Sequence, residues 1–261
     1  MIFNIIQLLS IYPDNNILVS LEKRTITIDC IKKLLRQDQL IFYYSAAHIM
    51  EADTMSAYDR FTKEELIVNR MRIIDELTDG NFIRMNTNKQ IFIENRYGLD
   101  AYSMVKDFPS VDQIKKGFQE NMTFEQRRMF REVLKIDASR LSSLPPKEAI
   151  QYLDERYRTA GIDTTFSGTI ELSLGMMKST GRPISLYDKI AVSFGLLDTV
   201  GYFRDKETNK SDFARMWDSS HATYAANFDV FLTNDSRTIK KSEVAYHMLN
   251  IPTQIISTNN S

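Results

Sequence analysis

Four short apolar runs constrain the fold of this 261-residue chain more than any other feature. Two lie near each end of the sequence: Leu8 to Tyr12, Leu40 to Tyr44, Val230 to Thr233 and Thr253 to Ser257. Their apolarity is continuous rather than alternating, which is typical of strands covered on both faces in a parallel sheet. Between the runs, apolar residues recur at helical spacing, in the stripes Ile28-Ile31-Leu34-Leu35, Leu186-Ile190-Phe194-Leu197 and Val244-Met248-Leu249. Strands that alternate with helices predict an α/β fold.

The middle of the sequence, residues 59–185, has a different pattern, with little strand-like sequence and much helical periodicity. Helices are expected over Lys63 to Leu77, Thr123 to Lys135 and Pro146 to Thr159, the last opened by a proline pair that suits a helix start. The sequence therefore predicts an α/β core from residues 1–58 and 186–261, interrupted by a mostly helical insertion over residues 59–185.

Composition narrows the class of protein. A formal net charge of -1 argues against a uniformly basic surface, so contacts with nucleic acid must come from local clusters of lysine and arginine. Cys30 is the only cysteine, which excludes an internal disulfide and a cysteine zinc site and fits a reducing compartment. The start lacks the features of a signal peptide, and no stretch approaches the roughly 20 apolar residues of a membrane helix. We therefore expect a cytoplasmic protein with no membrane partner.

Four acidic residues occupy positions where an α/β sheet presents side chains to a common crevice. Asp14 follows the first apolar run, Glu51 lies just after the second, Asp218 lies on the helix before the third, and Asp235 directly follows the third. Four ionised carboxylates in a small space need a cation, and oxygen ligands without thiolates select Mg²⁺ or Mn²⁺. Two such ions about 3.5–4 Å apart would support phosphodiester hydrolysis. This pattern predicts a metal-dependent nuclease in which these four acids are the catalytic and metal-binding residues.

The motifs around these acids resemble those of the PIN-domain nucleases. They read Tyr-Pro-Asp-Asn-Asn from Tyr12, His-x-x-Glu from His48, Asp-x-x-His-x-x-Tyr-Ala from Asp218, and Phe-Leu-Thr-Asn-Asp from Phe231. The resemblance covers the first ~58 and last ~75 residues and leaves the middle unmatched. Pro13 departs from the apolar residue usual before the first acid, and it lacks an N–H for sheet pairing.

The resemblance implies a three-layer α/β/α sandwich with a central, mostly parallel sheet and an acidic pocket that binds divalent metal. Most active members of the family cleave RNA, which implies an endoribonuclease with RNA as its partner, and many act as toxins or in phage defence. The family's acids fall on Asp14, Glu51, Asp218 and Asp235, and its polar pocket positions fall on Asn16 and Thr233. Related domains often pair, so a homodimer or a regulatory protein partner stays open.

Each acid also has a purely structural interpretation. Asp14 and Asp235 suit helix N-caps, and Glu51 and Asp218 suit solvated helix positions. The alternative function is a catalytically silent PIN-like module that binds nucleic acid or a protein partner through the insertion. A phosphatase-like hydrolase is disfavoured, because Asn16 stands where such enzymes need a second acid.

Two histidines and three basic residues lie close in the sequence to the predicted acids and are candidates for supporting roles. His48 lies three residues before Glu51 and His221 three residues after Asp218, so each shares a helical face with its acid. Each histidine either orients a carboxylate or phosphate, or packs as a structural residue. The basic residues just beyond the last acid are expected to flank a phosphate path, and these substrate-binding candidates are Arg237, Lys240 and Lys241.

Overall fold

The structure, a computed structural model, describes residues 8–56, 61–86, 89–105, 123–179, 181, 183–203 and 209–260. The chain divides into two compact units. The first comprises Met1–Phe108, Tyr224–Asp235 and Pro252–Ser261, and the second comprises Pro109–Thr223 and Ser236–Ile251.

This division differs from the predicted ranges, in which the α/β part was 1–58 with 186–261 and the insertion was 59–185. The first unit extends past residue 58 because the helices and strands up to Val105 pack on the N-terminal segment. Most of the residues from 186 onward that lie outside the sheet belong to the helical unit, because their helices share its apolar core.

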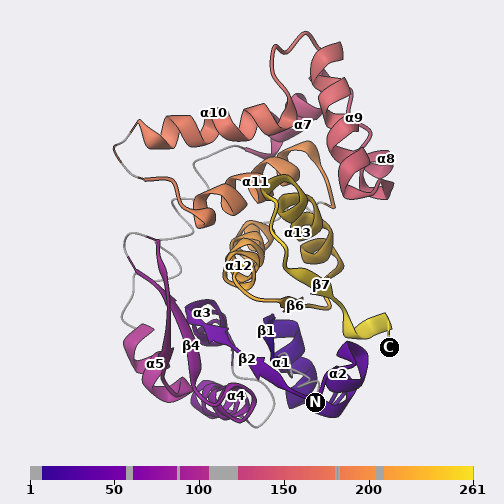
Figure 1. The fold of residues 1–261 in the computed structure, drawn as a ribbon. Coiled ribbons are helices and arrows are strands. Elements are labelled where there is room, and N and C mark those ends of the chain that lie inside the picture. Colours follow the sequence, from indigo (N-terminus) through magenta and orange to yellow (C-terminus); the bar gives the residue numbers. More distant parts are fainter. Residues whose placement is uncertain are drawn as a thin grey trace, which may run out of the picture. The chain divides into compact units, whose positions relative to one another are not determined.

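A parallel sheet in the first unit joins the two ends of the chain (Figure 1). Among the described residues its order is β2-β1-β6-β7, with the bounds β1 Leu9–Pro13, β2 Leu40–Phe42, β6 Val230–Leu232 and β7 Gln254–Ile256. Leu9 of β1 aligns with Leu40 of β2, and Ile11 of β1 aligns with Val230 of β6. The four predicted strands and the α/β class are therefore confirmed.

A second sheet in the same unit has the order β3-β4-β5 among the described residues, with the bounds β3 Tyr44–Ser45, β4 Asn81–Met85 and β5 Ile91–Asn95. The prediction that residues 59–185 contain little strand was wrong for the antiparallel β4 and β5. Phe82 and Ile83 of β4 are adjacent yet both fully buried, so this central strand shows no alternation of apolar and polar residues.

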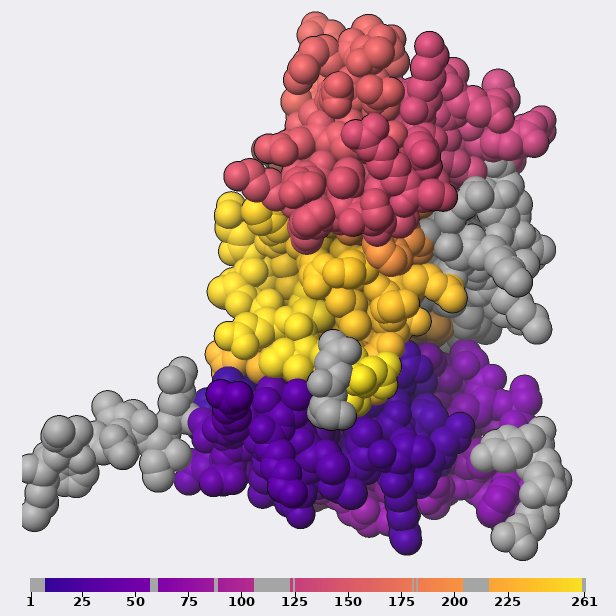
Figure 2. Space-filling model, turned by 90° about the vertical axis from the view of Figure 1, so that its right-hand side faces the viewer, coloured from indigo at the N-terminus to yellow at the C-terminus, as the bar shows by residue number. Residues whose placement is uncertain are grey.

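The helices of the first unit are α1 Asn15–Glu22, α2 Ile28–Leu35, α3 Ala46–Asp53, α4 Lys63–Thr78 and α5 Gly98–Val105. Local sequence fixes their starts: Thr62 and Glu65 form a reciprocal capping box at α4, and Ser45 and His48 form one at α3. On the face drawn in Figure 2, the N-terminal residues of this unit, coloured indigo to purple, form one continuous surface.

The helices of the second unit are α7 Phe124–Val133, α8 Ala138–Ser143, α9 Pro146–Thr159, α10 Phe166–Lys178, α11 Leu186–Val200, most of α12 Asn209–Ala225, and α13 Ser236–Leu249. The chain ends with the 3₁₀ turn η1, Thr258–Asn260, in the first unit. Helices were correctly predicted over 63–77, 123–135 and 146–159, with ends within two residues of the observed ones.

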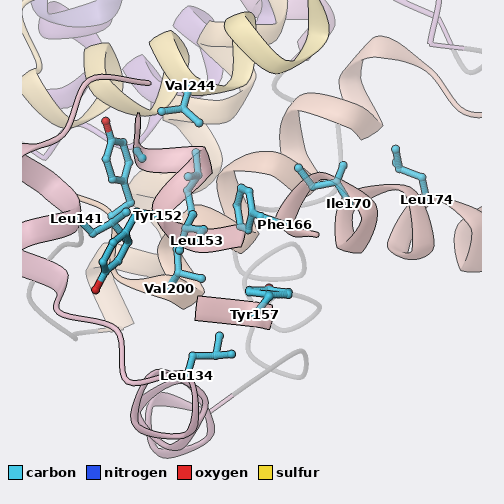
Figure 3. Packing of buried hydrophobic residues seen from close by; sticks show 13 residues of the cluster. Leu134, Leu141, Tyr152, Leu153, Tyr157, Phe166, Ile170, Leu174, Val200 and Val244 are labelled. Carbon is cyan, nitrogen blue, oxygen red and sulfur yellow. The ribbon is translucent and has the colours of Figure 1, made fainter. Parts of the chain in front are cut away.

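Side chains from several helices form the apolar core of the second unit (Figure 3). Tyr157 of α9 meets Phe166 of α10 edge-on, with ring centroids 6.4 Å apart, and Leu153, Val200 and Val244 are fully buried in the same cluster. Among the described helices of the chain, none is long and apolar enough to cross a membrane.

Candidate functional site

Asp14 lies at the carboxyl end of β1 and is almost completely buried, with 4% of its surface exposed. Its Oδ1 accepts hydrogen bonds from the backbone N–H groups of Asn16, at 2.8 Å, and Ile17, at 3.2 Å. Asp14 is therefore the N-cap of α1, as its structural interpretation requires. Its Oδ2 accepts from the Thr233 hydroxyl and, at 3.5 Å, from the Asn16 side-chain amide. Both carboxylate oxygens therefore accept hydrogen bonds within the protein.

Thr233 follows β6 and connects Asp14 to the C-terminal part of the site. Its fully buried hydroxyl donates to Asp14 and accepts from the backbone N–H of Asp235 at 3.2 Å. The backbone N–H of Asp14 in turn donates to the Leu232 carbonyl at 2.9 Å, which extends the β1 to β6 pairing. One hydroxyl therefore contacts both the carboxylate of Asp14 and the backbone of Asp235.

Asp14 lies at a topological switch point of the parallel sheet. From β1 the chain passes to β2 on one side, whereas β6 passes to β7 on the other side. The crossovers therefore diverge between β1 and β6, and their carboxyl ends carry Asp14 and Thr233. In open α/β sheets ligands bind at such points.

A buried polar network supports this edge of the sheet. His48 of α3 is fully buried; its Nδ1 accepts the backbone N–H of Ser45 at 3.0 Å, and its Nε2 lies 2.8 Å from the carbonyl oxygen of Pro13. A carbonyl only accepts, so Nε2 carries the proton and the ring is neutral. Both ring nitrogens contact backbone, so His48 fixes the peptide group just before Asp14. His48 is therefore a structural residue, and it affects Asp14 by holding the main chain.

Sequence reasoning missed two members of the network, Tyr12 and Ser45. The Tyr12 hydroxyl lies 2.7 Å from the Ser45 hydroxyl, and both side chains are fully buried. Burial raises the pKa of Tyr12 well above its ordinary value, and the charges of Asp14 and Glu51 raise it further. Ser45 stands three residues before His48, a cap spacing that could have revealed it, whereas Tyr12 reads only as a strand residue.

Glu51 lies in the last turn of α3 and is half-buried. Its charge contributes, with that of Asp14, to the raised pKa of Tyr12. Asn16 is exposed at the start of α1, and Asp235 is half-buried directly before α13. The first unit therefore holds three of the four predicted acids and both polar pocket residues.

The remaining predicted residues belong to the second unit. Asp218 is half-buried and His221 is buried, both on α12. On α13, Arg237 is exposed, and Lys240 is partly exposed and pairs with Glu243 at 2.8 Å.

The expected substrate contact by Lys241 is corrected by the structure. The Lys241 side chain is fully buried, and its Nζ lies 2.5 Å from Oδ1 of Asp198, which is 5% exposed. Lys241 faces the interior because α13 turns one side toward α11 in the helical core. An ammonium group enclosed with its counter-ion is not available to a phosphate path.

The side chains of Asp14 and Thr233 offer oxygen atoms, which suit a hard divalent cation. In the part of the chain that the structure describes, however, no three or more histidine, cysteine or acidic side chains gather in an arrangement that could hold a metal ion. Comparisons with protein-family models, with curated proteins and with solved structures found no match. Function is therefore inferred from the residues and their geometry.

Proposed function

We propose that this protein is a nuclease that uses Mg²⁺ or Mn²⁺ to hydrolyse phosphodiester bonds in RNA, built on a PIN-like three-layer α/β/α core. The observation that carries the proposal is the buried contact between Asp14 and Thr233 at the switch point between β1 and β6. This contact lies at the carboxyl ends of two parallel strands whose crossovers diverge, which is where open α/β sheets bind ligands.

The proposed roles divide between carboxylates and the groups that hold them. Asp14 would supply oxygen ligands to the ion, which when bound activates water and stabilises charge on phosphate oxygens. Glu51 and Asp235 of the first unit do not form a three-residue metal group with Asp14 in the described structure, so they would reach the ion through bound water. Thr233 holds Oδ2 of Asp14 and the backbone of Asp235, and His48 holds the Pro13 carbonyl. These contacts fix the direction of the Asp14 carboxylate before substrate arrives.

Binding of substrate would rely on exposed side chains. Arg237 and Lys240 of α13 reach solvent, but they belong to the second unit, and the proposal does not depend on them. The same holds for Asp218 and His221.

An Asp14→Asn variant tests the proposal. Asparagine caps helices as well as aspartate does, so α1 should remain folded while the carboxylate charge is lost. We expect the wild-type protein to cleave single-stranded RNA with Mn²⁺ and not with a chelator, and the variant to lose roughly 100-fold or more of that activity.

Asp229→Asn is the matched control for Asp14→Asn. Asp229 directly precedes β6, at the edge of the same sheet opposite Asp14, and is exposed. Its substitution should leave cleavage unchanged. Equal metal-dependent cleavage by the wild type and the Asp14→Asn variant would refute the assignment, because the activity would then come from another site or from a contaminant.

A catalytically silent PIN-like module that binds nucleic acid or a protein partner is the second candidate. It is favoured by the hydrogen bonds that both Asp14 oxygens accept within the protein, and by the lack of a three-residue metal group among the described residues. Titration calorimetry with Mn²⁺ separates the two candidates: the silent module gives the same heat for the wild type and for Asp14→Asn.

A further inference from the structure

The outer edge of β5 presents backbone groups that could pair with another strand. β5 is the last strand of its sheet, and its antiparallel pairing with β4 alternates between residues whose backbone groups face β4 and residues whose groups face away. The hydrogen bonds from Asn86 N–H to the Gln90 carbonyl and from Arg96 N–H to the Gly80 carbonyl show that even-numbered residues of β5 face β4.

The backbone groups of the odd-numbered residues Ile91, Ile93 and Asn95 therefore point outward. Within the described part of the chain, no hydrogen bond joins these outward groups to another residue.

The side chains of this edge are apolar and exposed. Phe92 is 43% and Ile93 is 57% exposed, and Tyr97 and Leu99 just beyond the strand are about half exposed. Proteins usually protect a sheet edge with lysine, proline or an unpaired charge, and β5 contains neither lysine nor proline. Its only charged residue, Glu94, is neutralised by ion pairs with Arg84 and with Arg96, the latter at 3.4 Å. Nothing in the strand opposes pairing.

The strand is complementary to itself in one register. If two copies of β5 meet in antiparallel orientation around Ile93, then Ile93 faces its counterpart and Ile91 faces Asn95 of the other copy. Each outward N–H then meets an outward carbonyl, and the contact closes as a two-fold dimer. In this register Glu94 lies opposite Phe92 rather than opposite the second Glu94, so like charges do not meet. These features favour a second copy of this chain over an unrelated strand.

We propose that two copies of this chain associate through antiparallel pairing of β5 centred on Ile93, which joins their three-stranded sheets. This association does not depend on nuclease activity.

The test measures the mass of the full chain by light scattering over a range of concentrations. The wild type should show a concentration-dependent dimer. Ile93→Lys places two like charges opposite each other, and Ile93→Pro removes an outward N–H that makes no bond to β4. Each variant should raise the dimer dissociation constant roughly tenfold or more.

Val68→Lys is the matched control, because Val68 is an apolar residue of the same unit that is 51% exposed on α4. It should change the dissociation constant by no more than about twofold, and circular dichroism should show all variants folded. A wild type that stays monomeric at every concentration overturns the proposal. The open edge of β5 would then suit a strand of another protein instead. A dimer that Ile93→Lys does not weaken also overturns it.

Discussion

Replacing Lys241 by methionine should destabilise the protein far more than replacing its neighbour Lys240. Lys241 is fully buried with its Nζ 2.5 Å from Asp198, whereas Lys240 is 41% exposed and pairs with Glu243. Removal of one member of a buried pair costs about 3–5 kcal/mol, because the remaining charge keeps its desolvation cost without its partner. An exposed pair contributes about 0–1 kcal/mol. The two variants share a helix and a substitution, so burial is the main difference between them.

The assay is denaturant unfolding followed by circular dichroism, with the free energy of unfolding compared among variants. Lys241→Met should lower that free energy by about 3–5 kcal/mol and Lys240→Met by less than about 1 kcal/mol. The double variant Lys241→Met with Asp198→Leu should recover most of the loss, since it leaves no buried charge at that pair. Equal losses for Lys240→Met and Lys241→Met would refute the reasoning, because they would show that the Lys241 ammonium is hydrated in solution.

Two further predictions follow from shifted pKa values. Hydrogen bonds from the Ser10 hydroxyl and N–H lower the pKa of Asp229 from its ordinary value of 3.8, so the stability that these bonds contribute is present above that pH and is lost as pH falls through the folded-state pKa. Ser10→Ala should therefore lower the free energy of unfolding at neutral pH. In acid unfolding curves, the difference in that free energy between the variant and the wild type should shrink. A hydrogen bond from the Thr27 hydroxyl lowers the pKa of the exposed Cys30 thiol. Thr27→Val should therefore slow the labelling of Cys30 by a maleimide dye at neutral pH, whereas Thr27→Ser, which keeps a hydroxyl, should not. Equal labelling rates for the wild type and both variants would show that this hydrogen bond does not set the thiol pKa.

Some residues of the candidate site could be predicted from the sequence, and others could not. The sequence placed Asp14 after the first apolar run, and the family resemblance implied a polar pocket position for Thr233; the contact between the two joins the ends of two neighbouring parallel strands. The role of His48 could not be found in this way. Its ring reaches the carbonyl of Pro13, 35 residues away, and only the packing of α3 beside β1 brings the two together.

Lys241 illustrates the same limit for charged residues. Beside Lys240 it reads as a member of a basic cluster, and both lie on a helix that the sequence predicts correctly. Which of the two lysines faces solvent depends on the neighbours of α13, and these include Asp198, 43 residues away. Burial and charge pairing are therefore properties of the fold rather than of the motif.

The sequence by itself determined the strands of the parallel sheet, most of the helices and their caps, because these depend on apolar periodicity and on side chains within four residues. The tertiary structure alone decided three other features: the buried strand β4 with its exposed partner β5, the neutral form of His48, and the enclosure of Lys241. Each of these depends on contacts with a distant segment, since the chain must fold before a side chain's solvent exposure and hydrogen-bond partners are fixed.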